Sequence, residues 1–153
     1  MLKYAFLAAL ALSTPAIAEE IGHVDTTTRL VGSNDRIVIE AYDDPGIPGV
    51  TCHVSRAVTG GVMADVGLGS NPNEASIACR QVGPIDWEKA QKLPQTDPEI
   101  FTQKTSILFK ELKVGRVVDR QRKVLVYLVY TTKGWDGSPK NVISSIPVMP
   151  WQQ

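Results

Sequence analysis

Histidine and cysteine are scarce in this chain, which has two of each among its 153 residues. The histidines are His23 and His53 and the cysteines are Cys52 and Cys79, and none of the Cys-x-x-Cys or His-x-x-x-His spacings of common zinc sites occurs. Cys52 and His53 are adjacent, so on a strand they point to opposite faces. We therefore predict no metal site, and we expect His53 to be an exposed strand residue.

Motifs for nucleophilic hydrolysis and for phosphate binding are absent as well. The sequence has no Gly-x-Ser-x-Gly or Ser-x-x-Lys motif, and Ser138-Pro139-Lys140 has the wrong spacing for a serine–lysine pair. Gly67-Leu68-Gly69 lacks the third glycine and the Gly-Lys ending of phosphate-binding loops. These absences predict no cofactor and favour a protein without catalytic activity.

Long apolar runs are missing too, since no segment after the N-terminus approaches the roughly 18 apolar residues of a membrane-spanning helix. At the N-terminus, Lys3 precedes a short apolar run, and alanines at positions 16 and 18 stand before Glu19. This pattern is typical of a cleaved secretory signal peptide. We predict a signal peptide at residues 1–18, a single domain at 19–153 without a transmembrane segment, and a periplasmic location, or secretion if the source has no outer membrane.

Net charge is zero, but the charge is unevenly distributed along the chain. Acidic residues dominate between Glu19 and Asp86, and basic residues dominate from Trp87 onward. Either strands from the two halves pair and their charges complement one another, or the basic residues form a surface for an anionic envelope polymer or lipid. These basic residues lack interleaved aromatic residues, so we predict no nucleic-acid partner. They are Lys104, Lys110, Lys113, Arg116, Arg120, Arg122 and Lys123.

Both cysteines fall on the apolar side of strand-like segments. Cys52 alternates with Val50 and Val54, and Cys79 alternates with Ile77. In an oxidising compartment an even pair of cysteines usually forms a disulfide. We predict a buried Cys52–Cys79 disulfide that joins two strands beneath a glycine-rich loop and contributes roughly 3–4 kcal/mol of stability.

The N-terminal part of the predicted domain has the alternation of a β-hairpin. The segments His23–Val31 and Arg36–Asp43 flank a turn at residues 32–35. In the second of these segments we expect Ile37, Ile39 and Ala41 to face the core, and the opposite side to face largely water.

The C-terminal part is β-prone after one short helix. Asp86 is a good N-cap for a helix ending near Leu93. The tract from Glu99 to Val118 is too long for one strand, so we place a break near Thr105 and a bulge at residues 110–112. Val124 to Tyr130 is apolar on both sides and predicts a central strand. The fold class is therefore all-β or β-rich: an antiparallel sandwich or partly closed barrel with one or two short helices.

The C-terminal tract from Ser138 to Trp151 is the strongest candidate for binding. It places Lys140, Asn141 and Trp151 on a segment whose prolines prevent a regular ladder. Trp151 either closes the open end of a barrel or forms part of an interaction groove.

A second candidate set combines two adjacent carboxylates with two arginines. These residues are Asp43, Asp44, Arg56 and Arg80. If they gathered in one pocket with a carboxylate of raised pKa, they would favour a small periplasmic hydrolase or lyase. Adjacent acids in a Pro/Gly-rich segment more often cap turns.

Several segments resemble the CreA family of exported bacterial proteins. They are Glu19–Gly22, Glu40–Pro45, Val50–Arg56, Ile77–Pro84, Ser138–Asn141 and Pro147–Trp151. The resemblance covers the whole predicted mature chain and implies a periplasmic protein of Gram-negative bacteria, but it carries no catalytic residue over. The signal-peptide pattern, the missing catalytic motifs and the unusual C-terminal tract lead us to favour a non-catalytic binding or interaction domain of the cell envelope, whose partner is an envelope protein or polymer, over the hydrolase or lyase.

Overall fold

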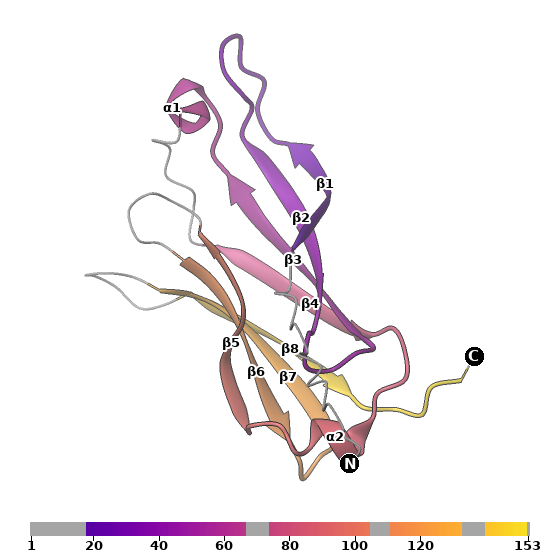
Figure 1. The fold of residues 1–153 in the computed structure, drawn as a ribbon. Coiled ribbons are helices and arrows are strands. Elements are labelled where there is room, and N and C mark those ends of the chain that lie inside the picture. The colour runs from indigo at the N-terminus through magenta and orange to yellow at the C-terminus, as the bar shows by residue number, and fades with distance from the viewer. Residues whose placement is uncertain (1–17, 67–73, 105–110, 133–139, 153) are drawn as a thin grey trace, which may run out of the picture.

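The computed structural model describes residues 18–66, 74–104, 111–132 and 140–152. Eight strands in this part of the chain form two antiparallel four-stranded sheets, in the orders β1-β2-β3-β4 and β5-β6-β7-β8 (Figure 1). The strands of the first sheet are β1 (Glu19–Asp25), β2 (Arg36–Asp43), β3 (Val50–Val58) and β4 (Ala75–Gln81). Those of the second are β5 (Thr96–Lys104), β6 (Glu111–Asp119), β7 (Val124–Thr132) and β8 (Asn141–Pro147).

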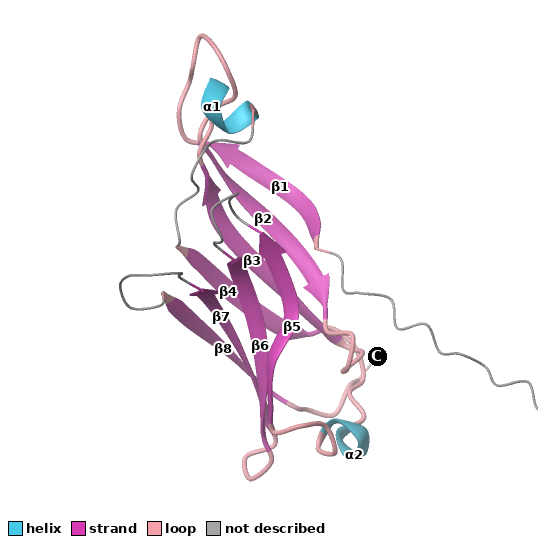
Figure 2. Ribbon diagram, turned by 60° about the vertical axis from the view of Figure 1, so that its left-hand side comes forward, coloured by secondary structure: helices cyan, strands magenta, loops and turns pink. Residues whose placement is uncertain are grey.

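The two sheets pack face to face as a sandwich, without closing into a barrel. Tyr42 on β2 stacks on Phe101 on β5, with ring centroids 4.9 Å apart and planes 11° from parallel. Along one side, the edge strands β4 and β8 lie next to each other (Figures 1 and 2). We call this line of contact the β4–β8 seam. The predicted fold class is confirmed in its sandwich form.

Two helices of four residues lie at opposite ends of the sandwich, α1 (Val62–Asp65) and α2 (Trp87–Ala90) (Figure 2). The predicted N-cap is confirmed, because the Asp86 carboxylate accepts a hydrogen bond from the backbone N–H of Lys89. The helix ends earlier than predicted, at Ala90. Near α1, the Asp65 carboxylate binds Ser33 in the β1–β2 connection. No helix of the described residues is long and apolar enough to cross a membrane.

The predicted N-terminal hairpin is present with different bounds, and the face assigned to β2 was wrong. β1 spans Glu19–Asp25 and pairs with β2 through a longer connection than expected. Ile37 and Ile39 are exposed on β2, whereas Val38, Glu40 and Tyr42 are buried. Glu40 can be buried on this side because Arg56 on β3 and Gln103 on β5 donate hydrogen bonds to its carboxylate, which the sequence of β2 alone does not reveal.

In the second sheet, the predicted break and the central strand are confirmed, but the bulge lies elsewhere. β5 ends at Lys104, and β7 lies between β6 and β8. Residue 110 lies outside the described part, and from Glu111 to Val114 the register with β5 is regular. The register shifts instead between Asp97 and Phe101 on β5. Opposite that shift is Gly115, where an added Cβ would come within 3.0 Å of the carbonyl oxygens of Asp97 and Pro98.

Candidate functional site

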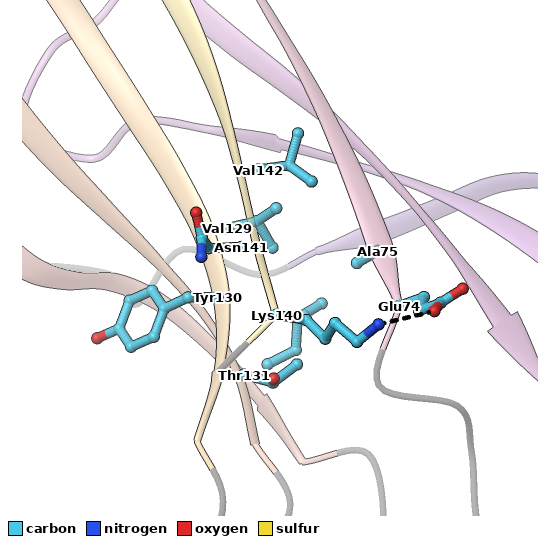
Figure 3. Close-up of a pocket in the computed structure, with 9 residues that line it drawn as sticks. Glu74, Ala75, Val129, Tyr130, Thr131, Lys140, Asn141 and Val142 are labelled. Atoms are coloured by element: carbon cyan, nitrogen blue, oxygen red, sulfur yellow. Dashed lines mark hydrogen bonds and ion pairs between the residues drawn. The ribbon is translucent and has the colours of Figure 1, made fainter. Parts of the chain in front are cut away.

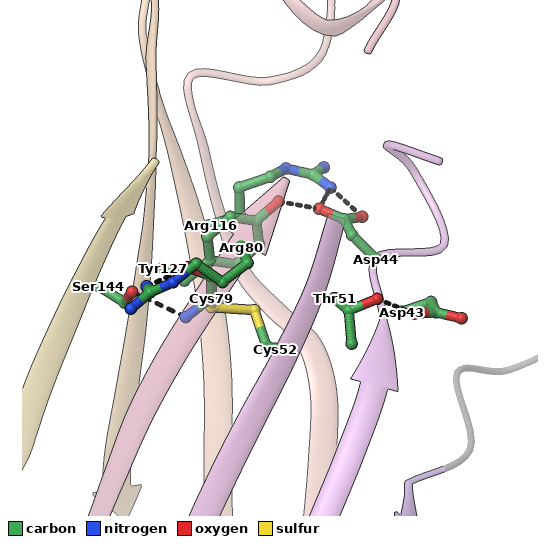
Figure 4. The surroundings of a disulfide bond; sticks show 9 residues. All are labelled: Asp43, Asp44, Thr51, Cys52, Cys79, Arg80, Arg116, Tyr127 and Ser144. Atoms are coloured by element: carbon green, nitrogen blue, oxygen red, sulfur yellow. Dashed lines mark hydrogen bonds and ion pairs between the residues drawn. A yellow bond between two sulfur atoms is a disulfide. The ribbon is translucent and has the colours of Figure 1, made fainter. Parts of the chain in front are cut away.

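The disulfide links β3 to the edge strand β4 in the first sheet. Cys52 on β3 and Cys79 on β4 are direct partners in the strand register, and each is 1% exposed. The predicted pairing is thus present, with both sulfurs on the buried side. On its other edge, Cys79 donates its backbone N–H to the Ser144 hydroxyl on β8 at 2.9 Å (Figure 4). Cys79 therefore connects β4 to both β3 and β8.

Above the disulfide, Asp44 occupies the centre of a buried polar network (Figure 4). Its carboxylate is fully buried and accepts hydrogen bonds from Arg116 at 2.6 and 2.7 Å and from the Tyr127 hydroxyl at 2.7 Å. The backbone N–H groups of Gly46 and Ile47 donate to the same carboxylate, which fixes the turn after β2. Arg116, which the basic-surface alternative would place on the exterior, is instead 3% exposed and joins the two sheets.

Burial in and beside this network also raises the pKa of two tyrosine hydroxyls. Desolvation, reinforced by the charge of Asp44, raises the pKa of Tyr127 well above its usual range. The pKa of Tyr42 is raised for the same two reasons. Both phenols therefore stay protonated in the folded chain at any physiological pH, which makes Tyr127 a permanent hydrogen-bond donor to Asp44.

A second polar cluster lies between the sheets at Glu40, Arg56 and Gln103. Arg56 donates two hydrogen bonds to the Glu40 carboxylate, each at 3.0 Å, and Gln103 on β5 donates a third at 2.8 Å. The side chains of Arg56 and Glu40 are 13% and 8% exposed. Because every charged group in this cluster has a partner, we assign it a structural role across β2, β3 and β5.

The four residues of the hydrolase alternative are distributed over separate environments. Asp44 and Arg56 belong to the two different networks described above, with Arg116 and Glu40 as their respective partners. Asp43 is exposed and accepts a hydrogen bond from Thr51. Only Arg80 lines one of the three pockets that we describe. These four residues therefore do not line one common pocket, as the hydrolase or lyase alternative required.

The pocket that Arg80 lines also contains Trp151. It is a groove of about 460 Å³ between the C-terminal end of β4, the end of β8 and the tail that follows β8. We call it the C-terminal groove. Trp151 is 41% exposed and closes no barrel. The groove is lined by Cys79, Arg80, Gln81, Ser145, Ile146, Pro147, Met149, Pro150, Trp151 and Gln152.

Gln81 fixes the tail that forms one wall of this groove. Its side-chain amide donates to the Met149 carbonyl oxygen and its amide oxygen accepts from the Met149 N–H, both at 3.0 Å. One glutamine side chain thus makes the paired contacts that a neighbouring strand backbone would make. Val148, 7% exposed, anchors the same tail in the core.

Lys140 and Asn141 line a different pocket, at the other end of the β4–β8 seam (Figure 3). We call this cavity of about 260 Å³ the seam pocket. Lys140 extends along its mouth toward Glu74, with 3.2 Å between Nζ and Oε1. The pocket is lined by Glu74, Ala75, Leu112, Val129, Tyr130, Thr131, Lys140, Asn141 and Val142.

Most basic side chains of the C-terminal half have local partners. Lys113 binds Glu99 at 2.7 Å, a contact that raises the pKa of Lys113 and lowers that of Glu99. Arg122 pairs with Asp119 at 2.9 Å. Arg120 donates to two backbone carbonyl oxygens. This local pairing favours charge complementation within the fold over a single basic surface.

The sequence predicted the environment of one of the two histidines. His53 is exposed on β3, as expected, while His23 contacts Glu20 at 3.0 Å. Within the described ranges, no group of three or more His, Cys, Asp or Glu side chains is arranged to hold a metal ion.

Sequence reasoning missed Thr131 and Tyr127, and it considered Arg116 only as part of a basic surface. Thr131 is 5% exposed and lines the seam pocket, and its hydroxyl has no hydrogen-bond partner among the described residues. Its only signal in the sequence was a polar residue continuing the buried alternation of β7. The partners of Asp44 could not have been found that way, because Arg116 and Tyr127 lie on other strands.

Comparison with known proteins covers almost the full length of the chain. A family model described as CreA protein matches residues 21–151. Protein CreA of Escherichia coli strain K12 is 47% identical over 148 residues, which are 96% of this chain and 94% of that protein. Protein CreA of strain CFT073 and that of Escherichia coli O157:H7 give the same values. No solved structure matches the chain. On this family match and this identity, the chain belongs to the CreA family.

Proposed function

We propose that this chain is a non-catalytic binding domain of the bacterial periplasm that holds an extended, acidic segment of an envelope protein in the C-terminal groove. The observation that carries the proposal is the presence of Arg80 and Trp151 in one groove. The N-terminal sequence pattern and the Cys52–Cys79 disulfide support an exported, oxidising location, because structural disulfides persist mainly there.

The apolar part of the groove has the composition of a protein-binding surface. Met149 and Trp151 are 60% and 41% exposed, and Val82, directly after the groove residue Gln81, is 52% exposed. Tryptophan, methionine and arginine are enriched at protein interfaces, and tryptophan and arginine dominate binding energies there. Since Gln81 and Val148 already fix the tail, binding costs little conformational entropy.

Arg80 supplies the charge preference. It is exposed, and among the described residues it forms no ion pair, its one hydrogen bond being from Nη1 to the Cys79 carbonyl oxygen at 2.9 Å. The remaining guanidinium N–H groups can bind a carboxylate in a bidentate manner. An aspartate, a glutamate or a C-terminal carboxylate beside an apolar side chain matches this arrangement.

Site-specific photocrosslinking in a Gram-negative host tests the proposal. A benzophenone amino acid replaces Trp151 in one variant and Leu30, which is fully exposed in the β1–β2 connection, in the control variant. We expect a discrete adduct at position 151, recovered in the periplasmic fraction, and no such adduct at position 30. Mass spectrometry of the adduct should place an acidic residue in the crosslinked segment.

Charge reversal provides the second arm. In the position-151 variant, Arg80→Glu should remove the adduct, whereas Arg122→Glu, at an exposed arginine paired with Asp119, should leave it unchanged. Equal adducts at positions 151 and 30, no adduct at 151, or insensitivity to Arg80→Glu would each reject the groove. Recovery of the chain in the cytoplasmic fraction would reject the location.

A further inference from the structure

Five large apolar residues lie uncovered at the end of the sandwich opposite α2. Leu30 and Val31 belong to the β1–β2 connection, which projects beyond the strands near α1 (Figures 1 and 2). Val62 and Met63 lie on α1, and Val66 directly follows it. Each of the five residues is more than half exposed, and Leu30 is completely exposed. We call them the apolar tip, and an exposed apolar cluster of this kind marks an interaction surface.

Backbone contacts hold the two segments of the tip together. The Gly61 N–H donates to the Ser33 carbonyl oxygen at 2.8 Å, and the Ser33 N–H and hydroxyl both donate to the Asp65 carboxylate. Gly32 has a φ of 81°, and an added Cβ there would come within 2.7 Å of the backbone nitrogen of Val62. The connection and α1 therefore form one unit that displays its apolar side chains from a fixed backbone.

In the tip, polar groups face one another and apolar groups face outward. Arg29 donates two hydrogen bonds of 2.8 Å to the Asp35 carboxylate, and the Gly60 N–H donates to the same carboxylate. On α1, the Asp65 side chain contacts Ser33, and no residue of the helix is buried. A helix that packs on a core does the reverse and buries its apolar side. Because the charged groups of the tip are already paired, an apolar environment can cover its outer side without isolating a charge.

Composition and shape indicate what covers the tip. Residues 26–35 and 59–66 contain no aromatic residue, and they hold two acidic residues and one basic residue. Protein interfaces are rich in aromatic side chains and arginine, and they use roughly 20–30 residues on each side. A projecting tip of five aliphatic and methionine side chains provides neither, whether the partner is another protein or a second copy of this chain. A lipid layer is fluid, so it accepts a projecting apolar group without a matching surface.

We propose that the apolar tip inserts into the boundary between the headgroups and the acyl chains of a phospholipid membrane. The tip attaches the chain to the membrane surface reversibly, through apolar contact and without a preference for anionic headgroups. The C-terminal groove stays in water, because Gln81 pairs with Val50, at the end of β3 opposite the one that leads into α1. No tip residue lines the groove, so the proposal is independent of the function proposed above.

Flotation with phosphatidylcholine vesicles tests the proposal. The chain is recovered from the periplasmic fraction of a Gram-negative host, and intact mass verifies that it begins at Glu19, because the apolar run of residues 1–18 would itself bind lipid. We expect the chain to float with the vesicles to the same extent at about 0.1 and 0.5 M salt, since salt screens charges and leaves apolar contact intact. Added phosphatidylglycerol, which is anionic, should not increase the bound fraction.

Two variants locate the membrane contact, and a third is the matched control. Leu30→Glu and Met63→Glu should each lower the vesicle partition coefficient by about tenfold, because each replaces a buried apolar contact with a charge. Ile143→Glu makes the same kind of change at a residue 60% exposed on β8, which lines none of the three pockets, and it should leave partitioning unchanged. All three positions are exposed, so circular dichroism should show an unchanged fold.

Every other result overturns the proposal. Absence of flotation does so, as does full flotation of both tip variants or an equal loss in Ile143→Glu. Release at high salt, or binding only with phosphatidylglycerol, would show attraction to charged headgroups instead. Sedimentation without lipid checks the remaining occupant, since a dimer abolished by Leu30→Glu would assign the tip to a second copy. A photoreactive residue at position 30 contacts lipid and gives no discrete protein adduct, so failure here leaves the crosslinking test at position 151 unaffected.

Discussion

Removal of the charge on Asp44 should destabilise the fold far more than removal of the charge on its neighbour. Asp44 is fully buried, and its carboxylate accepts hydrogen bonds from Arg116, Tyr127 and two backbone N–H groups. In Asp44→Asn one acceptor oxygen is lost, and Arg116, 3% exposed, keeps only Asp97 at 3.5 Å as an ionic partner. Breaking a buried pair in this way costs about 3–5 kcal/mol.

Asp43→Asn is the matched control, because it makes the same chemical change one position earlier in the chain. Asp43 is exposed and accepts a hydrogen bond from Thr51. Loss of one hydrogen bond of this kind lowers the free energy of unfolding by about 0.5–1.5 kcal/mol. Urea unfolding at pH 7 with the disulfide intact, followed by circular dichroism, measures both variants against the unsubstituted chain.

The double variant Asp44→Asn/Arg116→Met separates a buried ion pair from a mere loss of packing. With both charges removed, no unpaired charge remains in the core, so the double variant should be more stable than the sum of the two single changes predicts. Strict additivity would contradict the proposed coupling. A loss of less than about 1 kcal/mol in the unfolding free energy of Asp44→Asn would also contradict it, because a buried guanidinium without its carboxylate partner destabilises the fold by more than that.

Three other features give separate predictions. Non-reducing intact mass should show no free thiol, and reduction should lower the free energy of unfolding by roughly 3–4 kcal/mol; two free thiols in the native chain would exclude the bridge. Unfolding free energy should fall as pH rises above about 10, because the unfolded chain then releases tyrosine protons that burial retains in the fold; pH-dependent urea unfolding of Tyr127→Phe should show a shallower fall. Gly60→Ala should lower the melting temperature, since its Cβ would lie 2.3 Å from backbone carbonyl oxygens, whereas Gly22→Ala, with nothing within 4 Å, should not.

The sequence predicts a strand pairing correctly where the alternation of apolar residues and the chemistry of the side chains indicate the same buried face. Cys52 and Cys79 occupy apolar positions in strands that are hydrogen-bonded neighbours. Their positions in the alternation and the expected oxidising compartment both predicted the disulfide. The prediction failed on β2, where the apolar Ile37 and Ile39 face outward and Glu40 is buried. A carboxylate can be buried only with partners, and those of Glu40 are supplied by β3 and β5.

The candidate sites were predictable only in part, for a related reason. Lys140 and Trp151 were identified from the unusual C-terminal tract, but that tract divides between two pockets at opposite ends of the β4–β8 seam. Arg80 and Thr131 come from strands whose position beside this tract depends on the assembly of both sheets. Sequence pattern therefore indicated the segment, while the residues that complete each pocket required the tertiary structure.

Both pockets depend on β4, which explains why the disulfide matters even though it lines only one of them. The seam pocket uses Ala75 at the start of β4, and the C-terminal groove uses the end of that strand. β4 is an edge strand, and Cys79, at the inner limit of the C-terminal groove, joins it covalently to β3 and by a hydrogen bond to Ser144 on β8. An edge strand held at its centre from both sides keeps the geometry of both ends. The disulfide thus acts as a brace for the seam pocket and for the C-terminal groove, to which we assign binding.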